Sequence, residues 1–210
     1  IPFVKPLLRE EVKNRINKAT KIIENSLNGK KVFSFRSPRL WGSTTVVNSL
    51  EELGYLADAS YPLYYYEEQL IPYHPSKDDW TKKGSLKLVE IPNFADITLP
   101  KKDMYGRNRD QWPIFRTKGS VYLMKHINNF LDFVLNKNMQ AVLCFYFHPW
   151  EFIRLPKKFY YGEGAVIPDD FIIKNCGRFA LKQLEILIDI LIEKDAKFLT
   201  CFEIVSKYKW

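Results

Sequence analysis

Helix-like and short strand-like segments alternate along the chain, and this order restricts the fold more than any other feature of the sequence. Gly29 and Gly54 follow two helical patterns as stop signals, and Ser43 is placed to cap the second helix. The alternation predicts βα units, a mainly parallel sheet or barrel, and a single domain over residues 1–210. Helices are expected over residues 8–27, 44–53, 121–137, 179–193 and 201–208, and strands over residues 31–35, 55–60, 86–92, 141–147 and 196–200.

Length and charge limit the class of protein further. A chain of 210 residues is long enough for one domain with a substantial core and short for two. The formal charge of +8 is spread along the chain without a basic block, so nucleic-acid binding is the least favoured class. No stretch of sequence is long and uncharged enough to predict a membrane span. The cysteines Cys144, Cys176 and Cys201 are too widely spaced for a disulfide framework or a zinc cluster and are expected to be free.

Polar residues follow three of the expected strands directly. Arg36 ends the first strand, Asp58 the second, and His148 the strand over 141–147. In parallel α/β folds, the chemistry collects at the carboxyl ends of the strands, so these three side chains are expected on one face. An ion pair between Arg36 and Asp58 is expected there, either as a structural pair or as part of a functional site.

His148 is the strongest candidate for chemistry, although a histidine at a strand end can also be structural. Pro149 cannot donate a ladder hydrogen bond, so strand pairing stops and the imidazole is left at the rim. Trp150 supplies an apolar wall, and a histidine near neutral pH suits general acid or base catalysis. Glu151 is not expected to act with His148, because neighbouring residues of an extended chain point in alternate directions.

The other two histidines are weaker candidates. His126 lies in an expected helix and is predicted to be part of its packed face. His74 stands in a long loop with Asp78 and Asp79, whose spacing is not that of a metal site. Aromatic residues are frequent in the loops over 61–84 and 93–118, where they either stack on sugar rings or cover the rim of the sheet. The residues expected to contact a sugar are Trp41, Tyr61, Trp80 and Trp150.

Several segments, in the same order, resemble the polysaccharide deacetylases of the NodB-homology type, which form carbohydrate esterase family four. FRSPRLWGSTTVVNSLEELGYLADASYP resembles the family's Arg-x-Pro segment, helix and Gly-Tyr-x-x-Asp-x-Ser strand. VLCFYFHPWEF is similar to the family's last motif, a strand that ends in the acid histidine. LREEVKNRINKATKIIEN and KLVEIPNF resemble the helix and the strand around these motifs, and the likeness covers most of residues 7–205.

The resemblance implies a distorted (β/α) barrel and a metal-dependent hydrolase that removes N-acetyl groups from an amino-sugar polymer or oligosaccharide. In such enzymes a divalent metal, commonly zinc, activates the attacking water. The resemblance assigns His148 as the acid that protonates the departing amine, Arg36 as the orienter of the catalytic base, and Asp58 as the partner of Arg36. It also assigns Leu143 to the pocket for the acetyl methyl group.

The family's first two motifs, with the catalytic aspartates and the two metal histidines, have no counterpart in this sequence. The metal ligands and the base are therefore expected N-terminal to Ile1, together with the first strand of the barrel, and none of the metal ligands is expected within the chain. Three alternatives stay open: the deacetylase, a hydrolase of another linear or cyclic amide, and an inactive glycan-binding remnant without metal. Cytoplasmic and cell-envelope locations are both compatible with the sequence.

Overall fold

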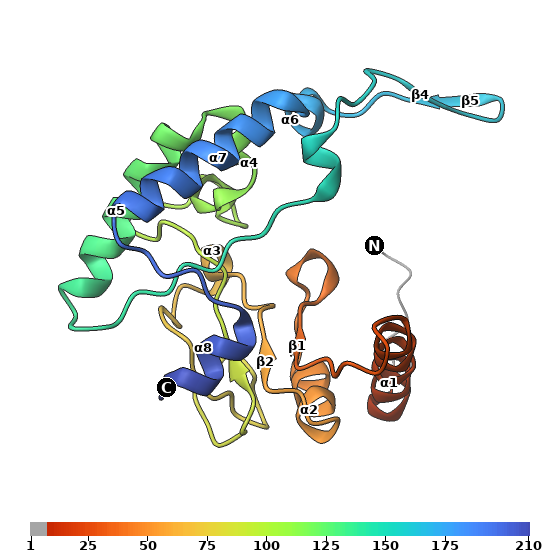
Figure 1. Ribbon diagram of the computed structural model, residues 1–210, viewed down its shortest axis with the longest axis vertical. Helices are drawn as coiled ribbons and strands as arrows, with labels where there is room; N and C mark the ends of the chain where they lie inside the picture. The colour runs from red at the N-terminus through yellow and green to blue at the C-terminus, as the bar shows by residue number, and fades with distance from the viewer. Residues whose placement is uncertain (1–7) are drawn as a thin grey trace. The chain divides into compact units, whose positions relative to one another are not determined.

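The computed structural model describes residues 8–210 and divides the chain into two compact units. Unit 1 comprises Ile1–Asn93 and Leu199–Trp210, and unit 2 comprises Phe94–Phe198 (Figure 1).

Unit 1 is built around a three-stranded parallel sheet in the order β1-β2-β3. α1 packs against α2, and α8 packs against β2. The predicted helix ends in this unit are confirmed: Ser43 Oγ accepts a hydrogen bond from the backbone N–H of Val46 at 3.2 Å, and Gly54 adopts a φ of 79° just after α2. The elements are α1 (Arg9–Ser26), β1 (Ser34–Phe35), the 3-10 helix η1 (Pro38–Leu40), α2 (Thr44–Glu52), β2 (Ala57–Asp58), α3 (Leu63–Tyr66), β3 (Val89–Glu90) and α8 (Cys201–Lys207).

The aromatic loop of unit 1 packs into the interior of the unit. Tyr61 and Tyr73 are almost completely buried, and Trp80 is nearly so. The Tyr61 ring lies 5.8 Å from both of the other rings, and Tyr73 donates a hydrogen bond to the carbonyl of Trp80 at 2.8 Å. Trp80 also covers Gly42, where a Cβ atom would lie only 2.4 Å from the indole ring. The absence of a side chain at Gly42 therefore makes room for Trp80.

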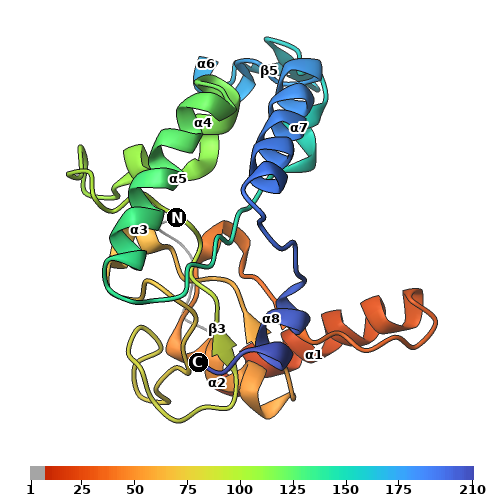
Figure 2. The ribbon, with the colours of Figure 1, turned by 60° about the vertical axis from the view of Figure 1, so that its left-hand side comes forward.

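Unit 2 is mainly helical, and α7 lies beside α4 and α5 (Figures 1 and 2). Ser120 does not cap α5 as its position suggests: Gly119 is the N-cap residue, and the N–H of Ser120 donates to Gln183 Oε1 of α7 at 2.7 Å. The β4–β5 hairpin extends away from the helices of this unit (Figure 1). The elements are the 3-10 helix η2 (Arg107–Arg109), α4 (Gln111–Thr117), α5 (Ser120–Leu135), the 3-10 helix η3 (Pro149–Phe152), β4 (Phe159–Tyr161), β5 (Gly164–Val166), α6 (Asp170–Ile173) and α7 (Arg178–Glu193).

Two of the expected strands are not formed as such. Residues 141–147 run as extended chain with one bridge position, at Cys144, whose carbonyl accepts a hydrogen bond from the N–H of Phe94 at 2.9 Å. Residues 196–200 are also irregular. A strand requires consecutive pairing with a neighbour, which an apolar run alone does not provide. Residues 8–210 contain the three-stranded sheet and the hairpin and no closed barrel. The distorted barrel therefore stays a prediction.

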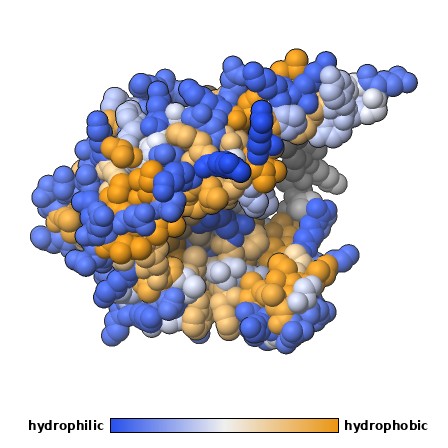
Figure 3. All heavy atoms as spheres, turned by 45° about the horizontal axis from the view of Figure 1, so that its top comes forward, coloured by the Kyte–Doolittle hydropathy of each residue, from blue (hydrophilic) through white to orange (hydrophobic). Residues whose placement is uncertain are grey.

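Large hydrophobic side chains also reach the surface in both units, and Figure 3 shows hydrophobic residues among hydrophilic ones on one face. Between residues 8 and 210, no helix has both the length and the apolar composition needed to traverse a bilayer. The three cysteines are half-buried and free of disulfides.

Candidate functional site

The carboxyl ends of the parallel strands in unit 1 bring polar side chains to one edge of the sheet. Phe35 of β1 pairs with Asp58 of β2, and Asp58 pairs with Glu90 of β3. Arg36 follows β1 directly. Two of the residues predicted from the sequence, Arg36 and Asp58, thus lie at the same edge, together with Glu90.

Asp58 and Glu90 form a buried carboxyl pair. Both residues are fully inaccessible to solvent. Glu90 Oε1 accepts hydrogen bonds from the backbone N–H groups of Ser60 at 2.9 Å and Tyr61 at 2.8 Å. Asp58 Oδ1 accepts one from Ser60 Oγ at 2.5 Å. No donor group of residues 8–210 reaches the second oxygen of either carboxyl group.

The titration of this pair follows from its burial. Burial raises the pKa of Asp58 to about 6, against the opposing effects of its hydrogen bonds and of Arg36. Burial, and then the negative charge of Asp58, raise the pKa of Glu90 well above its usual range. We therefore place on Glu90 a proton that the two carboxyl groups share through the side-chain hydrogen bond between them.

Arg36 is held beside this pair by the backbone. Its Nε donates to the carbonyl of Ala59 at 3.0 Å, and Asn93 Nδ2 donates to the same carbonyl at 2.8 Å. The positive charge of Arg36 lowers the pKa of Asp58, and it opposes the burial that raises the pKa of Cys201. This charge coupling supports the expected association of Arg36 with Asp58.

His148 of unit 2 begins the short turn of η3, and the turn brings Glu151 back to it. Glu151 Oε1 lies 2.9 Å from His148 Nδ1 and accepts a hydrogen bond from the backbone N–H of His148, also at 2.9 Å. The expectation that Glu151 would point away was wrong, because the chain turns after Pro149 and does not continue extended. The His148 side chain is 40% exposed, whereas that of Glu151 is fully buried. With Nδ1 engaged in this way, Nε2 is the ring nitrogen left for a ligand.

Glu151 is held in turn by a buried arginine. Arg116 Nε donates to Glu151 Oε2 at 3.0 Å, and both side chains are inaccessible to solvent. The remaining nitrogens of Arg116 donate to the carbonyls of Phe171, at 2.9 Å, and Lys174. A buried carboxylate that is paired and hydrogen-bonded in this way keeps a fixed orientation. Arg116, Glu151 and His148 therefore form one continuous chain of contacts from the interior to the surface.

Aromatic rings surround the imidazole of His148. The ring of Trp150 stacks on it with a centroid distance of 5.2 Å and an interplanar angle of 29°. Trp112 and Tyr146 contact it edge-on, at 5.5 and 5.9 Å. These rings limit the rotation of the imidazole and exclude water from part of its surface.

The residues expected to contact a sugar fall into two groups. Trp150 and Leu143 are half-buried in unit 2, and Trp41 of unit 1 is 58% exposed. Tyr61 and Trp80 belong to the interior packing of unit 1. Their burial supports the alternative interpretation of the aromatic loop, in which its rings cover the rim of the sheet and do not stack on a sugar.

The other two histidines have partners of their own. His126 Nδ1 lies 2.9 Å from Asp96 Oδ2 and the ring is nearly buried, in agreement with the predicted packing role. His74 Nδ1 lies 3.2 Å from the carbonyl of Leu88. Residues 8–210 contain no group of three or more His, Cys, Asp or Glu side chains arranged to hold a metal ion, so no step below is assigned to a metal on these residues.

Arg36 and Asp58 belong to unit 1 and His148 to unit 2, so the two clusters are described separately. Three of their members lie outside the sequence-based predictions. The sequence does contain a feature that points to Glu90, since a carboxylate inside the apolar run of 86–92 is rarely buried without a reason. It also contains one that points to Glu151, because a proline at the first position of a turn favours a helical start. No local feature of the sequence points to Arg116, since its partner is 35 residues away.

Comparison with known protein families, curated proteins and solved structures found no match to this chain.

Proposed function

We propose that this chain is part of a hydrolase that removes N-acetyl groups from an amino-sugar polymer or oligosaccharide, with His148 as the general acid. The observation that carries the proposal is the contact chain from Arg116 through Glu151 to His148. The motif resemblance supplies the reaction class, and the arrangement of these three residues supports the role of the acid.

The chemistry of amide hydrolysis requires such an acid. After water has added to the carbonyl carbon, the C–N bond breaks only if its nitrogen is protonated, because an amide anion is a very poor leaving group. The proton on Nε2 of His148 passes to that nitrogen, the C–N bonding electrons leave with the amine, and the acetyl group departs as acetate. The carboxylate of Glu151 at Nδ1 holds the ring in the required orientation, as carboxylates do in other histidine-dependent hydrolases.

Arg116 has a supporting role in this proposal. Its charge compensates that of Glu151 in the interior, so the carboxylate is held in place while its other oxygen contacts the imidazole. The proposal keeps the roles that the resemblance gives to Arg36, as orienter of the base, and to Asp58, as its partner. The divalent metal, commonly zinc, also remains part of the proposal on the resemblance alone.

The test is release of acetate from N-acetylated chitooligosaccharides by the intact protein. We expect His148→Ala to lower kcat by about 100- to 10,000-fold while circular dichroism shows an unchanged fold. Tyr161→Ala, at an exposed position of the hairpin, is the control and should leave kcat unchanged. An unchanged kcat for His148→Ala would refute its role as the acid. Glycan binding without any acetate release by the unaltered protein would favour the glycan-binding alternative instead.

Glu151→Gln tests the positioning of the imidazole separately from the acid itself. The amide keeps an oxygen for the His148 backbone N–H and loses the negative charge at Nδ1. We expect a lower kcat with little change in KM, because the charge acts on the proton transfer and not on sugar binding. A change in KM alone would contradict this assignment.

A further inference from the structure

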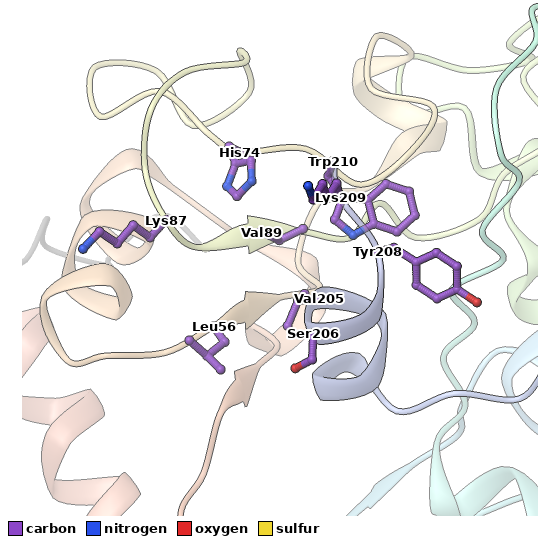
Figure 4. A pocket seen from close by; sticks show the side chains of 9 residues that line it. All are labelled: Leu56, His74, Lys87, Val89, Val205, Ser206, Tyr208, Lys209 and Trp210. Atoms are coloured by element: carbon purple, nitrogen blue, oxygen red, sulfur yellow. The ribbon is translucent and has the colours of Figure 1, made fainter.

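A pocket in unit 1 lies beside strands β2 and β3 (Figure 4). Leu56 directly precedes β2, Val89 belongs to β3, and Val205 of α8 faces them (Figure 4). These three apolar side chains form the floor of a pocket of about 420 Å³. This volume lies within the range of about 300–1,000 Å³ that is typical of small-molecule sites.

The rim of the pocket is basic. His74, Lys87 and Lys209 contribute to the lining, which contains no acidic side chain. Figure 4 shows the Lys87 side chain directed away from the other lining side chains, whereas Lys209 lies beside Trp210 and near His74. Because His74 Nδ1 contacts the carbonyl of Leu88, its Nε2 remains for a ligand. The ammonium group of Lys209, in a lining without an acidic side chain, favours an anion.

The segment after α8 adds aromatic rings and a hydroxyl group. Tyr208 and Trp210 line the pocket, and their ring centroids are 5.8 Å apart. Trp210 Nε1 donates to the carbonyl of Ile204 at 3.4 Å, which ties the indole to α8. Ser206 contributes its hydroxyl from the last turn of the helix. Aromatic faces next to hydrogen-bonding groups are typical of sites that hold a sugar ring.

We propose that this pocket binds an anionic sugar unit, a pyranose ring that carries a carboxylate or a phosphate group. Lys209 binds the anionic group, the aromatic rings contact the apolar face of the sugar, and Ser206 binds one of its hydroxyl groups. The inference uses residues of unit 1 alone and does not depend on the acid role of His148.

Isothermal titration calorimetry of the intact protein tests the proposal with four probes: glucuronate, glucose 6-phosphate, glucose and benzoate. We expect the two sugar anions to bind at least about tenfold more tightly than glucose or benzoate, since only they offer both a charge and a sugar ring. The comparison of glucuronate with glucose 6-phosphate identifies which anionic group is preferred. Binding of either should weaken as salt is added.

Matched lysine variants locate the site. Lys209→Gln should weaken binding of the sugar anions at least about tenfold. Lys207→Gln removes the same charge two residues away, from a side chain that pairs with Glu203 at 3.2 Å and does not line the pocket, so it should leave binding unchanged. His148→Ala should also leave binding unchanged.

Each contrary outcome overturns the inference. Equal binding of glucose and glucuronate would exclude recognition of the charge, and equal binding of benzoate would exclude recognition of the sugar. Equal weakening by Lys207→Gln and Lys209→Gln would show attraction to a general basic surface. No binding of any probe would show that the pocket is not a ligand site.

Discussion

Glu90→Gln tests the shared proton of the buried carboxyl pair. The glutamine amide reproduces the hydrogen bonds assigned to protonated Glu90. Its oxygen can accept from the N–H groups of Ser60 and Tyr61, and its Nε2 can donate to the carboxylate of Asp58. The variant therefore keeps the arrangement of the pair and removes its titration.

The magnitude follows from counting protons. Between the usual pKa of 4.5 and its own raised pKa, Glu90 of the folded protein holds a proton that an unfolded glutamate has released. Because the folded state binds the additional proton, the free energy of unfolding falls as the pH rises, by about 1.4 kcal/mol per pH unit. The fall continues until the pH reaches the raised pKa of Glu90. Over the pH range between the usual and the raised pKa of Glu90, the wild-type protein should thus lose stability relative to Glu90→Gln at about this slope.

Urea unfolding at several pH values and constant ionic strength measures this difference. Glu68→Gln is the matched control, because it makes the same substitution at a side chain that is 51% exposed and paired with Lys82. It should leave the pH dependence of the wild type unchanged. Parallel stability curves for the wild type and Glu90→Gln would refute the shared proton. So would a variant that loses stability more steeply than the wild type as the pH rises.

Two further variants test the packing of each unit. Arg116→Met leaves the buried carboxylate of Glu151 without its cation and should cost about 3–5 kcal/mol of unfolding free energy. Adding Glu151→Gln to this variant should recover part of the loss. If urea unfolding shows that the effects of the two substitutions simply add, the two residues are not coupled. Gly42→Ala places a Cβ atom against the ring of Trp80 and should cost about 1–3 kcal/mol and alter tryptophan fluorescence. Gly164→Ala, whose Cβ would meet its nearest neighbour at 3.6 Å, should change neither, and equal effects of the two alanines would exclude the steric explanation.

Local signals in the sequence predicted those features of the fold that depend on neighbouring residues. The cap at Ser43 and the turn at Gly54 are formed where expected, because each depends on residues within four positions. The apolar run over 141–147 suggested a strand, but consecutive pairing depends on a distant partner that the run does not specify. The insertion of Trp80 over Gly42 also joins segments 38 residues apart and has no local signal.

In the candidate site, too, the residues with a local signal were predicted and those that depend on distant partners were not. Position after a strand identified Arg36 and Asp58 as residues of one sheet edge, since connectivity alone places parallel strand ends together. The partners that determine the chemistry of His148 were missed. Glu151 was excluded because an extended chain was assumed, and Arg116 reaches it from another helix.

The two clusters bury carboxylates in different ways, and the difference fits the roles proposed for them. In unit 2 the charge of Glu151 is balanced by Arg116, and the carboxylate contacts His148 Nδ1. In unit 1 the second carboxyl group, Glu90, holds a proton in the place of a compensating cation. Because Glu90 holds the proton, Asp58 stays ionised above about pH 6 and can act as the anionic partner of Arg36. Glu90 thus preserves a charge at the sheet edge that burial alone would remove.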